Sequence, residues 1–414
     1  MSRLDELIAE LCPDGVESVL LSSVLKSVRT GLNPRKNFVL NTKRANNYYV
    51  TVKEITSGKI IFSDKTDKID SNAVSVIQQR SNLEYNDVLL SGIGTIGKVA
   101  LVDIPTDNWN CSESVFLLKP RTDKILPRFL MFLLGSNSVT SQWNKQSVGS
   151  TLRGIRMETV NNLRIPLPPL PVQREIVRIL DHFTEFTAEL TAQLAAEVTA
   201  RKKQYEYYRD ALLTFGEDVP VMTLGDVAEF KYGYTDTAKD SGAVRFIRIT
   251  DIGDNGKLQP TNRKYIDLTP DSEGYLLKKG DLLMARTGAT YGKTMLFEKE
   301  ANAVYASFLI RIRFPTGVVL PAYYWHFAQS GLYWNQANRL VSKAGQPQFN
   351  ANALKRVQIP IPSLEEQRRI IELLNRFDLL TNDLTSGLPA EIAARQKQYE
   401  YYRDQLLTFD GVTT

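Results

Sequence analysis

The chain has 414 residues, of which 43% are hydrophobic and 23% charged, and its formal net charge is +5. This length predicts two or three domains of ordinary globular composition, and no apolar run reaches the roughly 18 residues that would span a membrane. The modest positive charge does not by itself indicate a nucleic-acid partner.

The first 15 residues, MSRLDELIAELCPDG, carry acidic side chains inside an apolar pattern. A signal peptide would need an uninterrupted apolar core there, so we expect a cytoplasmic protein without a membrane partner. Two cysteines, Cys12 and Cys111, fit a reducing compartment and cannot build a disulfide framework. Together with His182 and His326 they give no zinc-ligand spacing, so we expect neither a metal site nor a cofactor.

Residues 1–165 are interpreted as a first globular domain that is rich in short strands. Strand-like runs are VLLSSVL from Val19, NYYVTV from Asn47, KVALV from Lys98 and SVFLLK from Ser114. Glycine-rich turns separate these runs, and a short helix is expected after Leu126 and Pro127. The domain is therefore predicted to be α+β.

Residues 166–216 are predicted to form a long helix. Three prolines between positions 168 and 171 mark its start. Apolar or aromatic residues then recur from Ile176 to Leu212, mostly at 4–3 spacing, which is typical of a coiled-coil seam. An amphipathic helix of this length, about 65 Å at about 1.5 Å per residue, must bury its seam on another element.

The second half of the chain repeats the first. KQYEYYRD occurs at Lys203–Asp210 and again at Lys397–Asp404, and IPIPSLEEQRRII follows IPLPPLPVQREIV at the same offset of 194 residues. We therefore expect a second globular domain over 217–359, with strands VRFIRIT, DLLMA, KTMLF and FLIRIRF, and a second long helix over 360–414. Gly387 and Pro389 should kink or restart that helix.

The repeat also continues across the chain ends. DGVESVLL near the start corresponds to EDVPVMTL after the first long helix, and the chain ends in LLTFDGVTT, where a third copy would begin. The order of elements is thus nearly cyclic. We predict that the two termini lie close together.

The simplest partner for each long helix is its own duplicate, in an antiparallel pair. The seam of this pair would contain Leu180, Phe183, Leu190, Leu194, Tyr205, Tyr208, Leu212, Leu374, Phe377, Leu384, Leu388, Tyr399, Tyr402 and Leu406. Tyr207 and Tyr401 would point outward, available to a partner. The alternative is that each helix packs only on its own domain. The predicted fold is thus α+β, a pseudo-two-fold tandem duplication of two similar globular domains separated by two long helices in an antiparallel coiled coil.

Two glycine-rich hairpins resemble nucleotide-binding loops, but each breaks the pattern. GIGTIGKV from Gly92 ends in Val99 where a P-loop needs Ser or Thr, and the second copy has Thr287 in place of the first glycine. Both copies continue into strands, whereas a P-loop opens a helix. We interpret them as tight hairpins whose Lys98 and Lys293 can touch a phosphate backbone.

Basic residues concentrate outside the long helices. Residues 172–215 hold six basic and seven acidic residues, and residues 364–409 hold six and eight, so the rest of the chain carries a net charge of +8. The divergent segments, the two hairpins and the loops before each long helix supply the predicted DNA-binding set: Arg29, Arg35, Lys36, Lys43, Arg44, Lys98, Arg153, Arg156, Arg245, Arg248, Arg263, Lys264, Arg286, Lys293 and Lys343. The alternative for any one of them is a solvated surface residue.

The sequence carries no recognisable catalytic constellation. It has no glycine-rich methyl-donor loop followed by an Asn-Pro-Pro-Tyr type tetrapeptide, since Arg35 follows Asn33 and Pro34, and no serine elbow. We therefore predict that the chain is not itself an enzyme.

The order of variable domain, helix, variable domain and helix resembles the specificity subunit of type I restriction–modification systems. The duplicated KQYEYYRD and the pair IPLPPLPVQREIV and IPIPSLEEQRRII carry this resemblance, which covers essentially the whole chain. It implies two target-recognition domains that read a bipartite, asymmetric double-stranded DNA target with a fixed spacer. It also implies two methyltransferase subunits docked on the helices, a restriction/translocase subunit joined through them, and no catalytic residue in this chain.

A competing interpretation is a duplicated, non-enzymatic nucleic-acid-binding or scaffold adaptor built on a coiled coil. It explains the helices but not the divergent basic segments between the repeated parts. The resemblance further predicts that the helix pair acts as a ruler between the two half-sites.

Overall fold

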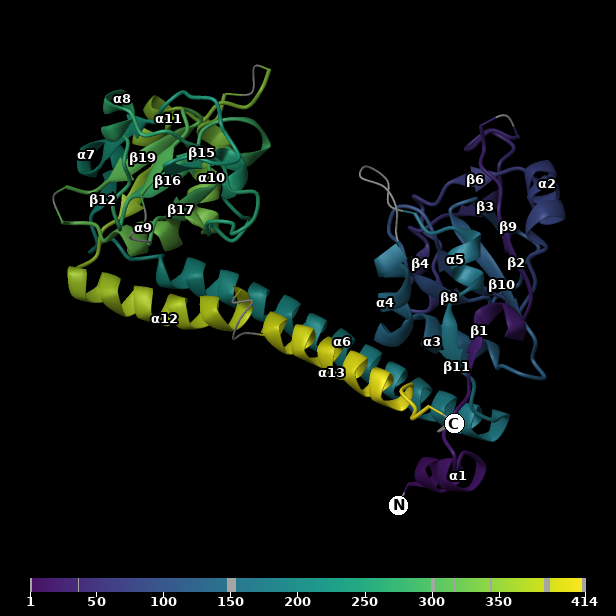
Figure 1. Cartoon of the computed structure of the whole chain (residues 1–414). Coiled ribbons are helices and arrows are strands. Elements are labelled where there is room, and N and C mark those ends of the chain that lie inside the picture. The colour runs from purple at the N-terminus through teal and green to yellow at the C-terminus, as the bar shows by residue number, and fades with distance from the viewer. Residues whose placement is uncertain are drawn as a thin grey trace. The chain divides into compact units, whose positions relative to one another are not determined.

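The computed structural model describes residues 2–35, 37–146, 154–298, 302–315, 317–342, 345–382 and 388–411. The chain forms two compact units. The first unit consists of residues 1–191 together with 394–414, and the second unit of residues 192–393. Each unit combines one globular domain with a stretch of paired helices (Figure 1).

The first unit is centred on an antiparallel four-stranded sheet in the order β2-β10-β7-β8. Its strands are β2 (Leu25–Thr30), β10 (Val115–Pro120), β7 (Val88–Ser91) and β8 (Val99–Leu101). All of β7 is buried, and its side chains alternate between two hydrophobic clusters, with Val88 and Leu90 in one and Leu89 in the other. This alternation follows from the two-residue period of a strand that is covered on both faces.

Three smaller sheets complete the strands of the first unit. They are β6-β3-β9 (Lys68–Ile69, Asn47–Val50 and Trp109–Cys111), β4-β5 (Ile55–Thr56 and Lys59–Ile60) and β1-β11 (Ser18–Leu20 and Arg164–Pro166). The predicted run VLLSSVL is not one strand, because the 3-10 helix η1 (Leu21–Val24) separates β1 from β2. Leu21 and Val24 of η1 are both fully buried. In a continuous strand these two residues would point to opposite faces, whereas the helical turn places both in the core.

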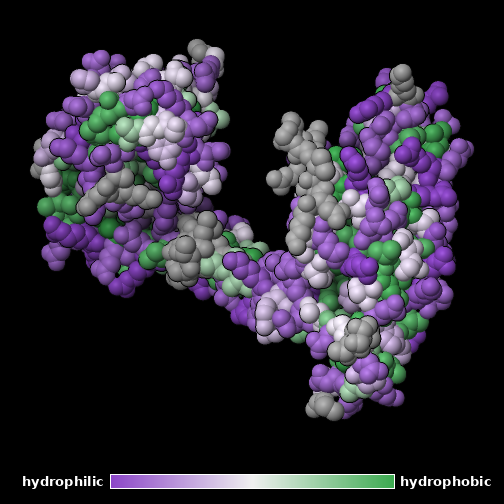
Figure 2. All heavy atoms as spheres, in the orientation of Figure 1, coloured by the Kyte–Doolittle hydropathy of each residue, from purple (hydrophilic) through white to green (hydrophobic). Residues whose placement is uncertain are grey.

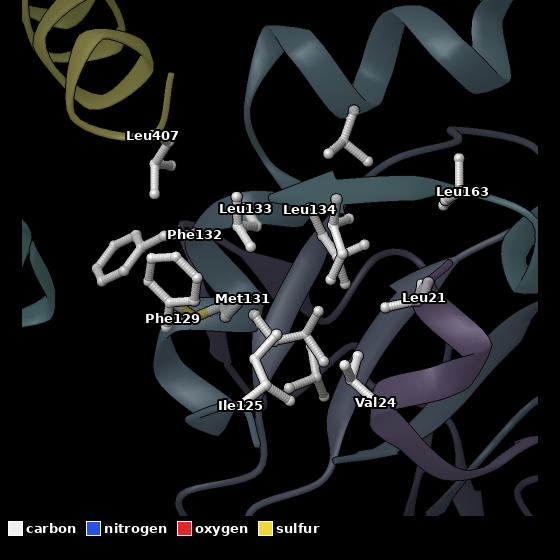
Figure 3. Close-up of a cluster of buried hydrophobic side chains, with 14 of the residues drawn as sticks. Leu21, Val24, Ile125, Phe129, Met131, Phe132, Leu133, Leu134, Leu163 and Leu407 are labelled. Carbon is white, nitrogen blue, oxygen red and sulfur yellow. The ribbon is translucent and has the colours of Figure 1, made fainter. Parts of the chain in front are cut away.

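The helices of the first unit are α1 (Arg3–Leu11), α2 (Ser71–Ser81), α3 (Pro127–Leu134), α4 (Asn137–Gln146), α5 (Met157–Asn161) and the start of α6 (Leu170–Leu212). The α3 helix begins at Pro127, as expected, and its residues Phe129–Leu134 are all buried. Figure 3 shows this cluster, to which Leu407 comes from the far end of the chain.

The second unit repeats the same arrangement. Its main sheet has the order β13-β19-β16-β17 (Glu229–Tyr232, Leu309–Arg313, Leu282–Ala285 and Thr294–Leu296), and its smaller sheets are β15-β14-β18 (Tyr265–Ile266, Val244–Ile247 and Ala303–Tyr305) and β12-β20 (Val221–Thr223 and Gln358–Pro360). In both units the small three-stranded sheet contains one antiparallel and one parallel pair. The duplication predicted from the sequence is therefore present in the fold.

The helices of the second unit include α9 (Pro321–Ala328), α10 (Gly331–Leu340), α11 (Ala351–Lys355) and α12 (Leu364–Asn382), with the short α7 (Leu224–Val227), η2 (Ile249–Asp251), α8 (Pro270–Glu273) and η3 (Gly288–Thr290). The predicted strand VRFIRIT ends at Ile247, since Ile249 already lies in η2. The sheet β4-β5 of the first unit has no counterpart among the described residues of the second unit, and the 11-residue α2, which follows β6, is replaced by the four-residue α8, which follows the equivalent strand β15. The two units thus differ in the same interval in which their sequences diverge.

The long helices pair in antiparallel fashion within each unit. In the first unit α6 meets α13 (Leu388–Leu406), where Phe183 stacks on Tyr402 with ring centroids 5.8 Å apart. In the second unit α6 meets α12, where Tyr208 stacks on Phe377 at 5.5 Å. The two stacks occupy repeat-related positions, so one aromatic contact is used twice. Leu180 and Leu374 are buried in the domain cores, so the helices pack on their own domains as well as on each other.

A buried glutamine attaches each long helix to its globular domain. Gln173 accepts a hydrogen bond from the Leu126 backbone N–H (2.9 Å) and donates to the carbonyl oxygens of Lys124 (2.9 Å) and Pro168 (2.8 Å). In the second unit Gln367 makes the three equivalent bonds, at 2.8 to 3.0 Å. Both side chains are fully buried, so the repeated glutamine satisfies backbone groups that would otherwise lack partners.

The aspartate that ends the repeated octapeptide binds the start of a domain helix. Asp404 accepts a hydrogen bond from the Asn137 N–H at the beginning of α4 (3.1 Å), and Asp210 accepts one from the Gly331 N–H at the beginning of α10 (3.0 Å). A carboxylate is favourable there because the first N–H groups of a helix lack partners within the helix. This contact explains why KQYEYYRD ends in Asp in both copies.

The segments next to the two chain ends meet, as the cyclic order predicted. The Val16 N–H donates to the Asp410 carbonyl oxygen (2.9 Å), and Val16 and Gly411 form a parallel bridge. In the second unit the repeat-related bond runs from the Val219 N–H to the Gly216 carbonyl oxygen within one continuous turn (3.3 Å). The hydrogen bond between the two chain ends therefore corresponds to a bond that lies within one continuous segment in the second unit.

Candidate nucleic-acid interface

In both units the first strand of the main sheet is followed by a glycine at the equivalent position. Gly31 follows β2 and Gly233 follows β13. A Cβ atom on Gly31 would lie 1.7 Å from the Cys111 carbonyl oxygen, and one on Gly233 would lie 2.1 Å from the Ala306 carbonyl oxygen. No other residue fits such a close approach. The divergent segments that follow therefore leave a shared scaffold at equivalent points.

In the first unit, most predicted DNA-binding residues on the divergent segment are exposed. Arg35, Lys43 and Arg44 lie between β2 and β3 and are all exposed. No hydrogen bond or ion pair to another described residue involves their side chains, so their charges are available to a ligand. Lys36 lies outside the described residues.

An arginine that the sequence analysis missed stands at the end of β2. Arg80, in the last turn of α2, donates from Nη2 to the Thr30 hydroxyl (3.2 Å), and the predicted residue Arg29 donates from Nη1 to the Arg80 carbonyl oxygen (3.4 Å). Arg29 and Arg80 thus meet although 51 residues separate them. Arg80 was not predicted, because the sequence analysis expected mainly strands in the first domain and no helix over 71–81.

The two glycine-rich segments form hairpin connections and not P-loops. Strands β7 and β8 pair antiparallel on either side of the first, whose Gly94 and Gly97 have left-handed φ angles of 82° and 86°. The Lys98 ammonium donates to the Val52 carbonyl oxygen (2.9 Å). That bond ties the hairpin to its own domain, so a phosphate contact by Lys98 would compete with it.

In the second unit, several predicted DNA-binding residues already face a carboxylate. Arg248 pairs with Asp251 (3.2 Å). Lys264 pairs with Asp240, and Lys293 pairs with Asp254. The Lys264 and Lys293 partners are more than nine-tenths exposed, and such exposed pairs contribute little to stability. Lys264 and Lys293 can therefore exchange their carboxylate partners for a phosphate at small cost.

Arg245 and Arg263 have backbone partners. Arg245 donates from Nη2 to the Gln259 carbonyl oxygen (2.7 Å), and burial lowers the pKa of its guanidinium. The exposed Arg263 donates from Nε to the Pro260 carbonyl oxygen (3.0 Å). Arg245 thus orders the loop that follows β14, whereas the remaining donors of Arg263 face solvent.

The loops before the long helices are described in part. Arg153 and Lys343 lie outside the described residues, and Arg156 is exposed at the start of α5. In the second unit this loop packs on the end of β16, where the Phe349 N–H donates to the Arg286 carbonyl oxygen (2.8 Å) and the Gly288 N–H donates to that of Pro347 (3.0 Å). Arg286 is therefore the predicted residue that the fold brings next to this loop.

The predicted helix seam is buried to different degrees. Leu180, Tyr205 and Leu374 are buried, and Phe183, Tyr208 and Tyr402 are about two-fifths exposed although each stacks on a partner ring. The other described members are half-buried: Leu190, Leu194, Leu212, Phe377, Leu388, Tyr399 and Leu406. Leu384 lies outside the described residues. The outward pair, Tyr207 and Tyr401, is 70% and 60% exposed.

A buried histidine stands where the second domain meets its helices. His326 lies within hydrogen-bond distance of the Tyr205 hydroxyl (3.3 Å) and of the Asn375 amide oxygen (2.9 Å). Burial lowers the pKa of its imidazole to about 4, against a smaller opposing effect of the Asn375 hydrogen bond. The repeat-related residue in the first unit is Phe132, so the imidazole is not needed for the fold of this junction.

The titratable groups do not form a metal-binding cluster in the part of the chain that the structure describes. There, no three His, Cys, Asp or Glu side chains are placed to hold a metal ion, and Cys12 and Cys111 are buried free thiols. Hydrophilic residues cover most of the visible face of each unit (Figure 2). None of the described helices is long and apolar enough to cross a membrane.

Two copies of a single α+β module with an attached helix define the class of this protein. A family model described as the type I restriction modification DNA specificity domain matches residues 13–200 and again residues 216–394. The chain therefore belongs to the family of type I restriction–modification DNA specificity proteins. The two matches correspond to the two copies of the sequence repeat.

Several curated relatives are similar to the chain. The putative type I restriction enzyme specificity subunit S.HindORF215P of Haemophilus influenzae is 38% identical over 260 residues, which is 60% of this chain and 65% of that protein. The EcoR124I/EcoR124II specificity subunit of Escherichia coli is 36% identical over 59% of this chain and 63% of its own length. The matches thus span slightly less than two thirds of these two relatives. The EcoprrI specificity subunit of Escherichia coli is 29% identical over 93% of both chains.

A solved structure shares the fold over nearly the whole chain. It belongs to work described as the structural basis underlying complex assembly and conformational transition of the type I R-M system. The TM-score is 0.67 at 20% sequence identity, with 95% of this chain and 97% of the other covered. At this identity the likeness concerns the fold alone.

Proposed function

We propose that this chain is the DNA specificity subunit of a type I restriction–modification complex, which reads a bipartite, asymmetric duplex target with one half-site for each unit. The observation that carries the proposal is the contrast between the shared and the divergent parts of the repeat. Both units keep the sheet order and the exit glycines Gly31 and Gly233, whereas the basic segments beyond them differ. A repeated scaffold with different readers suits two different half-sites.

The chemistry of cleavage and methylation would belong to partner subunits. The family membership supports a chain that binds DNA and does not modify it. Such a complex would act on DNA in the cytoplasm. The exposed cations Arg35, Lys43, Arg44, Arg156 and Arg263 are the residues we propose to contact the DNA backbone.

The test is an exchange of one reading domain. Residues 19–160 are replaced by the corresponding segment of a relative, and the chimera is co-expressed with the cognate methyltransferase subunits. We expect methylome sequencing to show one altered half-site and one unchanged half-site. Alteration of both half-sites, or methylation without a bipartite motif in the parent complex, would contradict the proposal.

We also propose that the repeated octapeptide is the docking site of two identical methyltransferase subunits. Its Asp, its first Tyr and its third Tyr have contacts within the fold, but its second Tyr, Tyr207 or Tyr401, is largely exposed in both copies. Lys203 and Lys397 are exposed beside them. Exposed residues that are identical in both copies, next to domains that diverge, fit two copies of one partner.

A hollow of about 410 Å³ adjoins this surface in the first unit. Ser136, Asn137 and Ser138 line it from the domain, and Lys397, Tyr401 and Asp404 are among the residues that line it from α13. Tyr401→Ala should weaken the binding of one methyltransferase subunit about fivefold or more, because a tyrosine at the centre of an interface often contributes more than about 1 kcal/mol. Native mass spectrometry would detect complexes that have lost one subunit, and Tyr85→Ala, an exposed tyrosine of the domain, is the control.

The competing function is a duplicated scaffold or RNA-binding adaptor. Electrophoretic mobility shift with duplex DNA, single-stranded RNA and both together separates the two. The proposed function requires duplex preference that increases when methyltransferase subunits are added. Equal binding of RNA, or no DNA binding in the assembled complex, would favour the adaptor.

A further inference from the structure

An arginine is held between two exposed aromatic rings at the end of the main sheet of the second unit. The guanidinium carbon of Arg286 lies 5.3 Å from the ring centre of Tyr232 and 5.5 Å from that of Phe308. Both rings are unusually open to solvent, with Tyr232 44% and Phe308 52% exposed. These three residues, which we call the arginine clamp, come from β13, the end of β16 and the turn before β19.

The clamp residues are held on several sides. The Arg286 N–H donates to the Phe308 carbonyl oxygen (3.0 Å), and its side-chain Nε donates to that of Ser307 (3.0 Å). The Tyr232 hydroxyl accepts a hydrogen bond from the Ala351 N–H (3.1 Å). With Nε engaged, the Nη1 and Nη2 atoms have no hydrogen-bond partner among the residues that the structure describes. The fixed arginine therefore carries a free planar pair of donors.

The shared scaffold does not require this cluster. At the repeat-related positions the first unit has Thr30, Gly92 and Ser114, and Phe116 fills the space in which an arginine would stand, since a Cβ on Gly92 would lie 2.2 Å from its ring. The first unit also places a different arginine, Arg80, on Thr30. The same end of the sheet thus presents an arginine in both units, but from unrelated elements.

We propose that the arginine clamp reads a guanine through the major groove in the half-site of the second unit. This inference rests on the proposed function and deepens it by assigning a base-reading residue. Two parallel Nη donors match the O6 and N7 acceptors of guanine, a pattern that no other base offers. The rings of Tyr232 and Phe308 hold the guanidinium plane by cation–π contact and limit its rotation.

A phosphate contact would not need this construction. Lysines and mobile arginines bind phosphate without an aromatic support, and the exposed Arg263 of the same unit has no ring on it. Two rings left half-open to water lose part of the benefit of burial, a cost that a bound base pair would remove. The clamp therefore favours a base edge as its ligand.

The test uses the assembled complex with its methyltransferase subunits. The parental target is first mapped by methylome sequencing, and the domain exchange described above shows which half-site belongs to the second unit. Arg286→Lys keeps the charge but loses the planar pair of donors. We expect it to lower discrimination at one G·C position of that half-site by about tenfold to a hundredfold in methylation rates on matched and substituted duplexes. The other half-site should keep its preference.

One further variant and a control sharpen the result. Phe308→Ser introduces the residue of the first unit and should relax the same position by a smaller factor, because the guanidinium loses one of its two supports. Arg339→Lys, at an exposed arginine of α10, should leave the motif unchanged.

The outcomes separate the inference from the proposed function. If Arg286→Lys weakens binding equally on all duplexes and relaxes no base position, the residue contacts phosphate and the inference is wrong. An unchanged motif, or relaxation confined to the half-site of the first unit, also overturns it. If the parental complex methylates no bipartite target, the proposed function fails, whatever the variants do.

Discussion

Gln173 and Gln367 show how much a single side chain can contribute to the attachment of a helix. Each is fully buried and satisfies one backbone N–H and two backbone carbonyl oxygens from segments on either side of the helix start. An alanine there would leave those groups buried without partners. The cost of an unsatisfied buried group is about 1–3 kcal/mol.

Replacement of Gln173 by alanine should therefore lower the free energy of unfolding of the first unit by about 2–4 kcal/mol. Urea unfolding with hydrogen exchange measures this loss and should show it at the Leu126 amide, which loses its acceptor. Gln396→Ala, at an exposed position of α13, should change stability by less than about 0.5 kcal/mol. Equal stability of the two variants would disprove the role of Gln173.

His326 gives the second unit a pH dependence that the first lacks. Its pKa falls from an ordinary 6.5 to about 4 in the folded state, chiefly through burial. The unfolded state then binds more protons between these two values, so stability is complete above about pH 6.5 and is lost as the pH falls towards 4. Charged groups around the ring are Asp378, Arg209 and Lys257.

We expect the second unit to lose on the order of 2 kcal/mol between pH 7.5 and pH 5 through this residue. In His326→Phe, which carries the residue of the first unit, this part of the pH dependence should disappear, even if the variant is less stable at all pH values because Asn375 loses its partner. Thermal unfolding followed across pH 5 to 7.5 measures the slope. A slope that is the same in the variant would show that other groups cause it.

At the residue scale, the sequence predicted cations but not their partners. The positions of Arg248 and Lys264 in the divergent segment and of Lys293 in the hairpin were predictable, whereas their carboxylate partners depend on how loops fold back. Arg80 and the rings around Arg286 escaped notice because their neighbours are remote in sequence. Contacts between strand ends cannot be derived from spacing along the chain.

Among the elements, α6 supplies part of its length to each unit. It runs for 43 residues without a break, and each of its two parts pairs with a different helix. A helix rises about 1.5 Å per residue, so its length would set the distance between two DNA readers. The proposed ruler therefore corresponds to the length of α6.

Insertion of four residues after Ala195 should lengthen the spacer of the DNA target and leave the bases of both half-sites unchanged. Four residues add about 6 Å and little more than one helical turn, so the apolar seam keeps nearly the same face. Methylome sequencing measures the spacer. Replacement of four residues at the same place without insertion should preserve it, and a change of recognised bases would contradict the ruler.

The repeated elements were the most predictable part of the fold. The hairpins, the proline-marked helix starts and the restart of the last helix near Gly387 and Pro389 all follow from local chemistry, and α13 begins at Leu388. The helix α2 and the sheet β4-β5 were not predicted, since the second copy has only the four-residue α8 in place of α2 and no described counterpart of β4-β5. Repetition helps where both copies agree and gives no guidance where they diverge.

For the molecule as a whole, the contact between Val16 and Asp410 predicts that the order of the repeats is exchangeable. A circular permutant would join the original ends by a short linker and open between Glu217 and Asp218, which are exposed in the repeat-related turn. We expect a soluble protein that supports methylation of the parental target. Circular dichroism and methylome sequencing check fold and function.

A permutant opened within the buried strand β7 serves as the control and should not fold, because its ends would fall inside the main sheet of the first unit. If the first permutant is as insoluble as this control, the repeats are not exchangeable. The near-cyclic order itself was visible in the sequence, since DGV occurs both near the start and near the end. The hydrogen bond that closes the cycle was not, because it joins residues almost 400 positions apart.

The division of the chain into units also reverses the usual order of folding during translation. The second unit is one continuous segment, 192–393, whereas the first needs residues 394–414, including Leu407 of its core. At about 5–20 residues per second, a nascent first domain waits on the order of 10 to 40 s for the tail that completes it. Residues 394–414 of the first unit are therefore synthesised after the whole of the second unit, and a chain that stops before residue 394 leaves the first unit, rather than the second, unfinished.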